Sequence, residues 1–232
     1  MRRLLLLWLC CCAALCKAEE RRSGFDTMSP ALQAMQRDDA SSPAMLWVEA
    51  GRELWAARCA SCHAQKKMLS GLAARYPAWD ASSARPITLP QRIQAHVRLS
   101  EEDLLSVTAY IGLQSRGLAI APSGDRRLDA FAQQGRQLFE RRMGQLNLSC
   151  AQCHDERAGQ SLGGSVIPQG HPTGYPLYRL EWQTLGSLER RLRNCVTGVR
   201  AAPLTQDELT DLELYLMRRA AGMAMDAPAV RP

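Results

Sequence analysis

The chain has 232 residues, nine of them cysteines, and a formal net charge of +6 at pH 7. Three of the positive charges lie in the first 18 residues, so the rest of the chain carries a net charge of about +3. A charge this small gives no support to general binding of nucleic acids or membrane surfaces. No stretch after residue 18 is apolar enough to span a bilayer.

Residues 1–18 have the features of a secretory signal peptide. Arg2 and Arg3 form the positive start, an apolar core runs from Leu4 to Leu15, and Cys16-Lys17-Ala18 fits a cleavage site. We therefore expect a periplasmic protein that loses four of its nine cysteines with the signal. A membrane anchor or a lipidated cysteine is the alternative, although Leu15 rather than a small residue precedes Cys16.

Two Cys-X-X-Cys-His pentads contain four of the five remaining cysteines. Such a pentad is the attachment signal of haem c, because its cysteines form thioethers with the porphyrin and its histidine binds the iron. The sequence therefore predicts two covalently bound haem c groups. The predicted attachment residues are Cys59, Cys62, His63, Cys150, Cys153 and His154. The fifth cysteine, Cys195, has no partner left for a disulfide within the chain.

The remainder of the chain repeats one plan twice. Gly51–Trp55 precedes the first pentad as Gly135–Phe139 precedes the second, and each belongs to an amphipathic pattern that predicts a helix. Farther on, Ser100–Asp103 and Thr205–Glu208 each fit a capping box at the start of another helix.

A helix, a haem pentad, a loop and a second helix make up the plan of a small cytochrome c domain. We therefore expect an all-α fold with two tandem cytochrome c-type domains, at residues 49–120 and 130–232. An N-terminal segment at 19–48 precedes them, and a linker at 121–129 joins them, since Ala121-Pro-Ser-Gly-Asp125 has a loop composition. Each domain is small for an independent core, and a covalent haem would supply a large apolar surface for packing.

The repeats also predict the second iron ligands. Leu89–Val97 aligns without a gap with Leu188–Val196, so His96 and Cys195 occupy the same position. We expect His96 to be the second iron ligand of the first haem and Cys195 to be that of the second haem. The predicted metal ligands are thus His63, His96, His154 and Cys195. The alternatives are Met68 as ligand of the first haem, a surface role for His96, and an inert buried thiol at Cys195.

Longer motifs in both repeats indicate one family. In the second repeat they are Ser149–His154, Pro168–Gly170, Gly174–Pro176, Tyr178–Gly186 and Arg190–Cys195. In the first half they are Gln33–Gln36, Met45–Trp47, Leu54–Trp55, Ala109–Ile111 and Gln114–Gly117. From about residue 30 onward the chain resembles SoxA, the cytochrome subunit of the SoxAX sulfur-oxidation complex.

The resemblance implies an L-cysteine S-thiosulfotransferase. In this family SoxA and its partner SoxX join thiosulfate oxidatively to a cysteine of the carrier SoxYZ, and the electrons pass through haem to an acceptor cytochrome c. The resemblance further implies that Cys195 ligates the catalytic haem and carries sulfur as a persulfide. It assigns the substrate anion to Arg191, which lies one helical turn before Cys195 if residues 188–195 are helical. Three nearby arginines are interpreted as surface residues that face solvent or a partner: Arg190, Arg193 and Arg200.

One residue departs from the family pattern. The position of His96 is usually a cysteine in dihaem members, and bis-histidine ligation predicts a higher potential for the first haem. The remaining histidine, His171, is interpreted as a loop residue. Two other functions stay open: a dihaem electron carrier in which Cys195 is only a ligand, and a thiosulfate dehydrogenase that forms tetrathionate. The latter family lacks the motifs of the second repeat.

Overall fold

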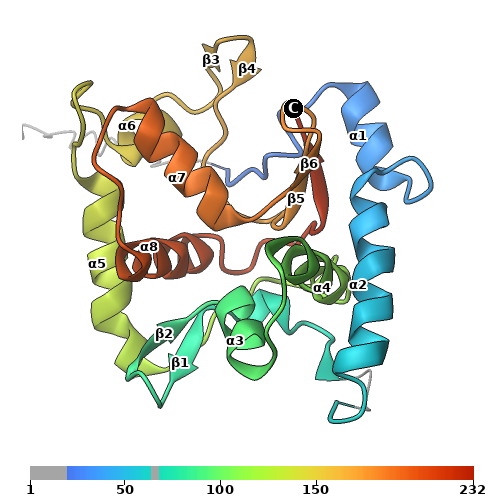
Figure 1. The fold of residues 1–232 in the computed structure, drawn as a ribbon. Helices are drawn as coiled ribbons and strands as arrows, with labels where there is room; N and C mark the ends of the chain where they lie inside the picture. The colour runs from blue at the N-terminus through green and yellow to red at the C-terminus, as the bar shows by residue number, and fades with distance from the viewer. Residues whose placement is uncertain (1–19, 64–67) are drawn as a thin grey trace, which may run out of the picture.

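The computed structural model describes residues 20–63 and 68–232 (Figure 1). The predicted signal peptide lies outside these residues. In the described ranges, no helix combines the length and the apolar character that are needed to cross a lipid bilayer.

The first repeat is built from two long helices with a hairpin and a short helix between them. Its elements are α2 (Ala44–Arg58), η2 (Ala73–Arg75), β1 (Ala78–Asp80), β2 (Arg85–Ile87), α3 (Leu89–His96) and α4 (Glu101–Leu113). The Ser100 side chain caps α4 by accepting a hydrogen bond from the Asp103 amide. A capping box that was not predicted, between Thr88 and Gln91, begins α3.

The second repeat has the same order of long helix, hairpin, short helix and long helix, but its 3-10 helix precedes the first long helix and its pentad forms a helix of its own. Its elements are η3 (Arg126–Leu128), α5 (Asp129–Glu140), α6 (Cys150–His154), β5 (Leu177–Arg179), β6 (Thr184–Gly186), α7 (Leu188–Gly198) and α8 (Gln206–Arg219). The predicted capping box between Thr205 and Glu208 is closed in both directions at the start of α8. An additional small hairpin, β3 (Ser161–Leu162) with β4 (Ser165–Val166), lies in the longer loop that follows α6.

The repeated glycine explains why the long helices of each repeat pack closely. In Figure 1, α2 lies beside α4 and α5 beside α8. A Cβ atom at Gly51 would lie 2.0 Å from the Ser106 carbonyl oxygen on α4. A Cβ atom at Gly135 would lie 2.0 Å from the Asp211 carbonyl oxygen on α8. Only glycine permits both contacts, which explains the motif that precedes each pentad.

The two repeats share part of their hydrophobic core. One cluster contains Ile111 and Ile120 of the first repeat together with Leu185, Met217 and Ala227 of the second. The chain segments that follow α4 and α8 also form hydrogen bonds with each other. The Ile120 amide donates to the carbonyl of residue 223 at 2.8 Å, and the Ile120 carbonyl accepts from the amide of residue 222 at 2.7 Å. The repeats thus pack as neighbours against a common interior. A second cluster belongs to the second repeat alone and surrounds Phe139, Leu192, Leu212 and Leu216.

Short strands depart from the all-α prediction. Besides the hairpins, β7 (Ala229–Arg231) pairs in parallel with β5 and gives a three-stranded sheet in the order β6-β5-β7. The N-terminal helix α1 (Pro30–Arg37) packs on β7, and Gln36 accepts a hydrogen bond of 3.0 Å from the Val230 amide. Helix α1 therefore belongs to the second repeat in space, and α2 begins before the predicted boundary at residue 49.

Candidate active site

The second pentad forms a short helix whose histidine is held in one orientation. A capping box between Ser149 and Gln152 begins α6, which places Cys150, Cys153 and His154 on a single turn and a half. The Nδ1 atom of His154 lies 2.7 Å from the Pro168 carbonyl oxygen. Since that oxygen only accepts, Nδ1 donates and Nε2 is left with the lone pair that binds a metal. Burial lowers the pKa of His154, so its imidazole is neutral at pH 7.

Helix α7 brings the unpaired cysteine to the same place. Ser187 caps α7, and the buried face formed by Leu188, Leu192 and Val196 fixes the rotation of the helix. Arg191 and Cys195 then lie one turn apart, as predicted, and both line a cavity of about 180 Å³ with Cys150 and His154. Burial raises the pKa of Cys150 to about 11, and the charge of Cys195 adds to this effect because the two sulfurs are near each other.

We call this space between α6, α7, α8 and the 165–179 segment the haem cavity, because its residues offer donors for a covalently bound haem. Its donor set is a cysteine for a thioether, an imidazole with a free Nε2 and a second sulfur, which matches the ligation of c-type cytochromes. Gly170 lies against the imidazole, where a Cβ atom would be 3.2 Å from the His154 ring. Cys153 lies on α6 but outside the described lining.

The charges in the haem cavity include an arginine without a counterion. Among the described residues, no carboxylate pairs with Arg191. Tyr175, which sequence reasoning missed, also lines the cavity, and burial raises its pKa to about 12, so it remains a hydrogen-bond donor at neutral pH. The signal that could have found it is its place in the repeats, where Tyr175-Pro176 matches Tyr76-Pro77.

The first pentad has a different environment. Cys59 ends α2, while Cys62 and His63 are exposed and the His63 ring lies 5.7 Å from that of Trp55. His96 is exposed at the end of α3 and lines another cavity, whose described lining includes no residue of the first pentad. Met68, the alternative ligand, is 50% exposed. The structure thus gathers the predicted second ligand set in one cavity, whereas His63 is not in the described lining of the cavity that contains His96.

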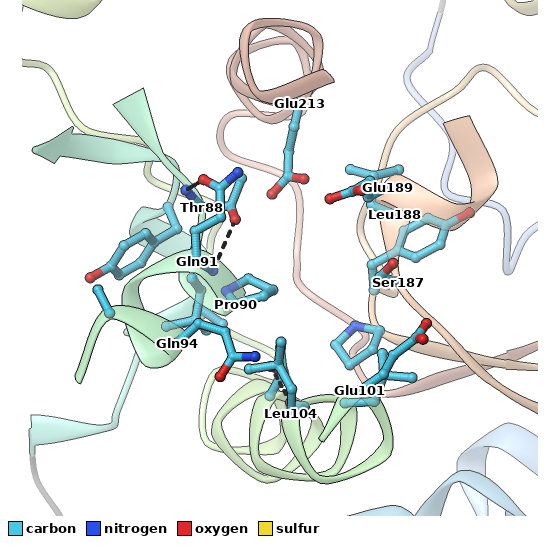
Figure 2. Close-up of a pocket in the computed structure, with 18 of the residues that line it drawn as sticks. Thr88, Pro90, Gln91, Gln94, Glu101, Leu104, Ser187, Leu188, Glu189 and Glu213 are labelled. Carbon is cyan, nitrogen blue, oxygen red and sulfur yellow. Dashed lines mark hydrogen bonds between the residues drawn. The ribbon is translucent and has the colours of Figure 1, made fainter. Parts of the chain in front are cut away.

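The cavity lined by His96 lies between the repeats and has a volume of about 1000 Å³. Figure 2 shows its walls, which come from α3 and α4 of the first repeat and from α7 and α8 of the second. We call it the interdomain cavity. The Glu213 side chain projects into it from α8. Burial, followed by the charge of Glu189, raises the pKa of Glu213 to about 8.

The other residues considered from sequence have ordinary contacts. Arg190 lies 4.2 Å above the Trp182 ring, and Arg193 forms an ion pair of 2.9 Å with Glu189. Arg200 is exposed. His171 lies on a loop, as predicted, with its Nδ1 2.9 Å from the backbone carbonyl of residue 22, and it also lines the haem cavity.

Comparisons with known proteins agree with this architecture. A sequence model described as the SoxA/TsdA cytochrome c domain matches residues 45–120 and 134–225, one segment in each repeat. These segments contain both haem pentads together with α3 and α7, and therefore every ligand residue predicted from sequence. The L-cysteine S-thiosulfotransferase subunit SoxA of Pseudaminobacter salicylatoxidans is 31% identical over 92% of this chain and 82% of the relative. The SoxA subunit of Paracoccus pantotrophus is 29% identical over 90% of this chain and 78% of the relative.

A solved structure shows the same fold. The crystal structure of SoxXA from P. pantotrophus superimposes with a TM-score of 0.85 and 27% identity, covering 91% of this chain and 87% of that chain. Sequence and structure thus agree over most of the chain. The chain belongs to the SoxA family of c-type cytochromes.

Proposed function

We propose that the protein is the catalytic subunit of a SoxAX-type L-cysteine S-thiosulfotransferase, which joins thiosulfate to a cysteine of the carrier SoxYZ. The names of its relatives support the reaction class. The observation that carries the proposal is that Cys195 and unpaired Arg191 line one cavity with Cys150 and His154 of the second pentad. A protein that only carries electrons needs neither a second sulfur nor an unpaired cation there.

The chemistry of the reaction accounts for these groups. A sulfur–sulfur bond forms between the carrier thiol and the outer sulfur of thiosulfate, the thiol loses its proton, and two electrons leave. A haem held by Cys150 and His154 would supply a one-electron acceptor, so the two electrons would leave one at a time toward an acceptor cytochrome c. Arg191 binds the sulfonate oxygens through charge-assisted hydrogen bonds. Cys195 can carry the sulfur between the two partners: its thiol joins the outer sulfur of thiosulfate with loss of one proton and the two electrons, and the carrier thiolate then attacks that sulfur and releases the Cys195 thiolate.

Several features of the assembly belong to the same proposal. SoxX is the partner subunit, and the support is the close match of this chain to the SoxXA structure from P. pantotrophus. Two haems are attached, with His63 and His96 on the first and His154 and Cys195 on the second. The support for His96 is its position in the repeat, equivalent to that of Cys195. Residues 1–18 direct the chain to the periplasm, where haem c is attached.

Replacing Cys195 tests the catalytic proposal. In a complex reconstituted with SoxX and SoxYZ, Cys195→Ala should abolish thiosulfate-dependent reduction of an acceptor cytochrome c and the addition of thiosulfate to the carrier, which mass spectrometry detects. Haem content, measured as the pyridine haemochrome, should remain equal to that of the wild type. Turnover that survives with only an altered haem potential would instead support the electron carrier. Tetrathionate formed without SoxYZ would support the thiosulfate dehydrogenase.

A further inference from the structure

The internal duplication identifies an exchange of charge next to Arg191. The hairpin β1–β2 corresponds to β5–β6, since each follows a Tyr-Pro dipeptide and precedes the short helix α3 or α7. Asp80 ends β1 and Arg179 ends β5, so an acidic residue of the first repeat is replaced by a basic residue in the second. By the same alignment, Arg92 on α3 corresponds to Arg191 on α7.

In the first repeat the equivalent arginine is neutralised. Arg92 forms an ion pair of 2.9 Å with Asp80, whose side chain is only 8% exposed. Hydrogen bonds from Ser82 and Ser83 also stabilise this carboxylate and hold the pKa of Asp80 well below its usual range. The two side chains on β1 and α3 therefore meet and cancel each other's charge.

In the second repeat the same two positions carry two positive charges. Arg179 and Arg191 both line the haem cavity. Among the described residues, the carboxylate paired with Arg179 is that of Glu181, at 2.9 Å, and it is 64% exposed while Arg179 is 15% exposed. An exposed ion pair of this kind is weak and leaves most donors of the guanidinium free. The third arginine in the lining, Arg231, is neutralised by Asp226 at 2.8 Å.

The lining of the haem cavity brings these groups together. Arg179 and Arg191 line it together with Cys195 and Tyr175. Burial raises the pKa of Tyr175, so its hydroxyl stays protonated at neutral pH. The two arginines therefore share the cavity with the sulfur of Cys195.

We propose that Arg179 is a second substrate-binding residue, which together with Arg191 holds the sulfonate of thiosulfate beside Cys195. This inference rests on the proposed function. Thiosulfate is a dianion, and placing it next to a sulfur that becomes anionic requires more than one positive charge in a site of reduced dielectric. The second repeat has Arg179 where the first has Asp80. This exchange leaves Arg191 without the ion pair that Arg92 forms, and it adds a second positive charge.

Two substitutions test the role of Arg179. Arg179→Asp recreates the ion pair of the first repeat and should lock Arg191 as Asp80 locks Arg92; Arg179→Gln only removes the charge. Isothermal titration of thiosulfate into the purified SoxAX complex without carrier should show affinity about tenfold lower for Arg179→Gln and about a hundredfold lower for Arg179→Asp. The KM for thiosulfate should rise in parallel while kcat changes little.

Controls separate this role from others. Arg193→Gln removes a charge from the same helix as Arg191 but outside the haem cavity, and it should leave the affinity unchanged. The proposal predicts an unchanged haem content and haem potential in both Arg179 variants. An affinity for thiosulfate equal to that of the wild type in Arg179→Gln would overturn the role of Arg179. A shifted haem potential together with that unchanged affinity would indicate that Arg179 binds a haem carboxylate instead. Absence of thiosulfate binding by the wild type would overturn the proposed function itself.

Discussion

Replacing Glu213 by glutamine should remove a pH dependence of stability that the interdomain cavity creates. In the folded protein the pKa of this carboxyl is raised to about 8, first by burial and then by Glu189, compared with 4.5 for a free glutamate. Between these two values the unfolded chain has released the proton and the folded protein still holds it. The free energy of unfolding is therefore undiminished by Glu213 below about pH 4.5, and it decreases as the pH rises toward 8.

The size of the effect follows from the width of this window. One pH unit corresponds to about 1.4 kcal/mol, so the interval from 4.5 to about 8 sets an upper limit of about 5 kcal/mol. Glu213 is half-buried, and water that enters the cavity reduces the desolvation. We therefore expect a loss of about 2 to 4 kcal/mol for the wild type, equivalent to a decrease in Tm of roughly 10 °C for a protein of this size.

Thermal unfolding followed by circular dichroism from pH 5 to pH 9 measures this difference. The Tm of Glu213→Gln should fall less than that of the wild type, so the two curves should separate at alkaline pH. Glu53→Gln, which removes an exposed carboxyl on α2, is the matched control and should follow the wild type. If Glu213→Gln also followed the wild type over the whole range, a buried and protonated Glu213 would be refuted.

Two further predictions concern helix packing and the first haem. Gly135→Ala places a methyl group 2.0 Å from the Asp211 carbonyl oxygen and should destabilise the protein by about 3 kcal/mol, whereas Gly198→Ala, with nothing within 4 Å, should not lower the Tm. His96→Ala should abolish the low-spin bis-histidine signal of the first haem in electron paramagnetic resonance and leave the second haem unchanged. A first haem whose low-spin signal is of the histidine/methionine type, and which loses it in Met68→Ala but keeps it in His96→Ala, would identify Met68 as the ligand instead.

The features that could be predicted from sequence are local or repeated. The pentads, the capping box of α8, the Ser100 cap of α4 and the gap-free alignment of α3 with α7 depend on residues a few positions apart. They were sufficient to place Cys195 and Arg191 on one helix with the second pentad nearby. Duplication strengthened each of these predictions, because a pattern seldom occurs twice in equivalent places by accident.

The features that were not predicted depend on contacts between distant segments. The strands β1, β2, β5, β6 and β7 have only three residues each, too short for a recognisable alternating pattern. The packing of α1 on β7 joins the two ends of the described chain, and no local signal indicates it. Glu213 is one of four acidic residues on α8, together with Asp207, Glu208 and Asp211, and only the structure shows that its side chain projects into a cavity between the repeats.

The exchange of Asp80 for Arg179 was visible in the sequence but required a longer alignment of the repeats. Tyr76-Pro77 and Tyr175-Pro176 place these two residues at the same offset, outside the segment that aligned His96 with Cys195. The significance of the exchange became clear only when the structure showed Arg92 paired with Asp80 and Arg191 unpaired in the haem cavity.

The central claim is that Cys195 takes part in sulfur transfer, and mass spectrometry of the native protein tests it most directly. The protein would be purified from a periplasm competent for haem attachment, incubated with and without thiosulfate, and analysed intact and as peptides before and after mild reduction. We predict two covalently bound haems and extra sulfur on Cys195 that mild reduction removes. An unmodified Cys195 under all of these conditions would contradict sulfur transfer and favour a protein that only carries electrons.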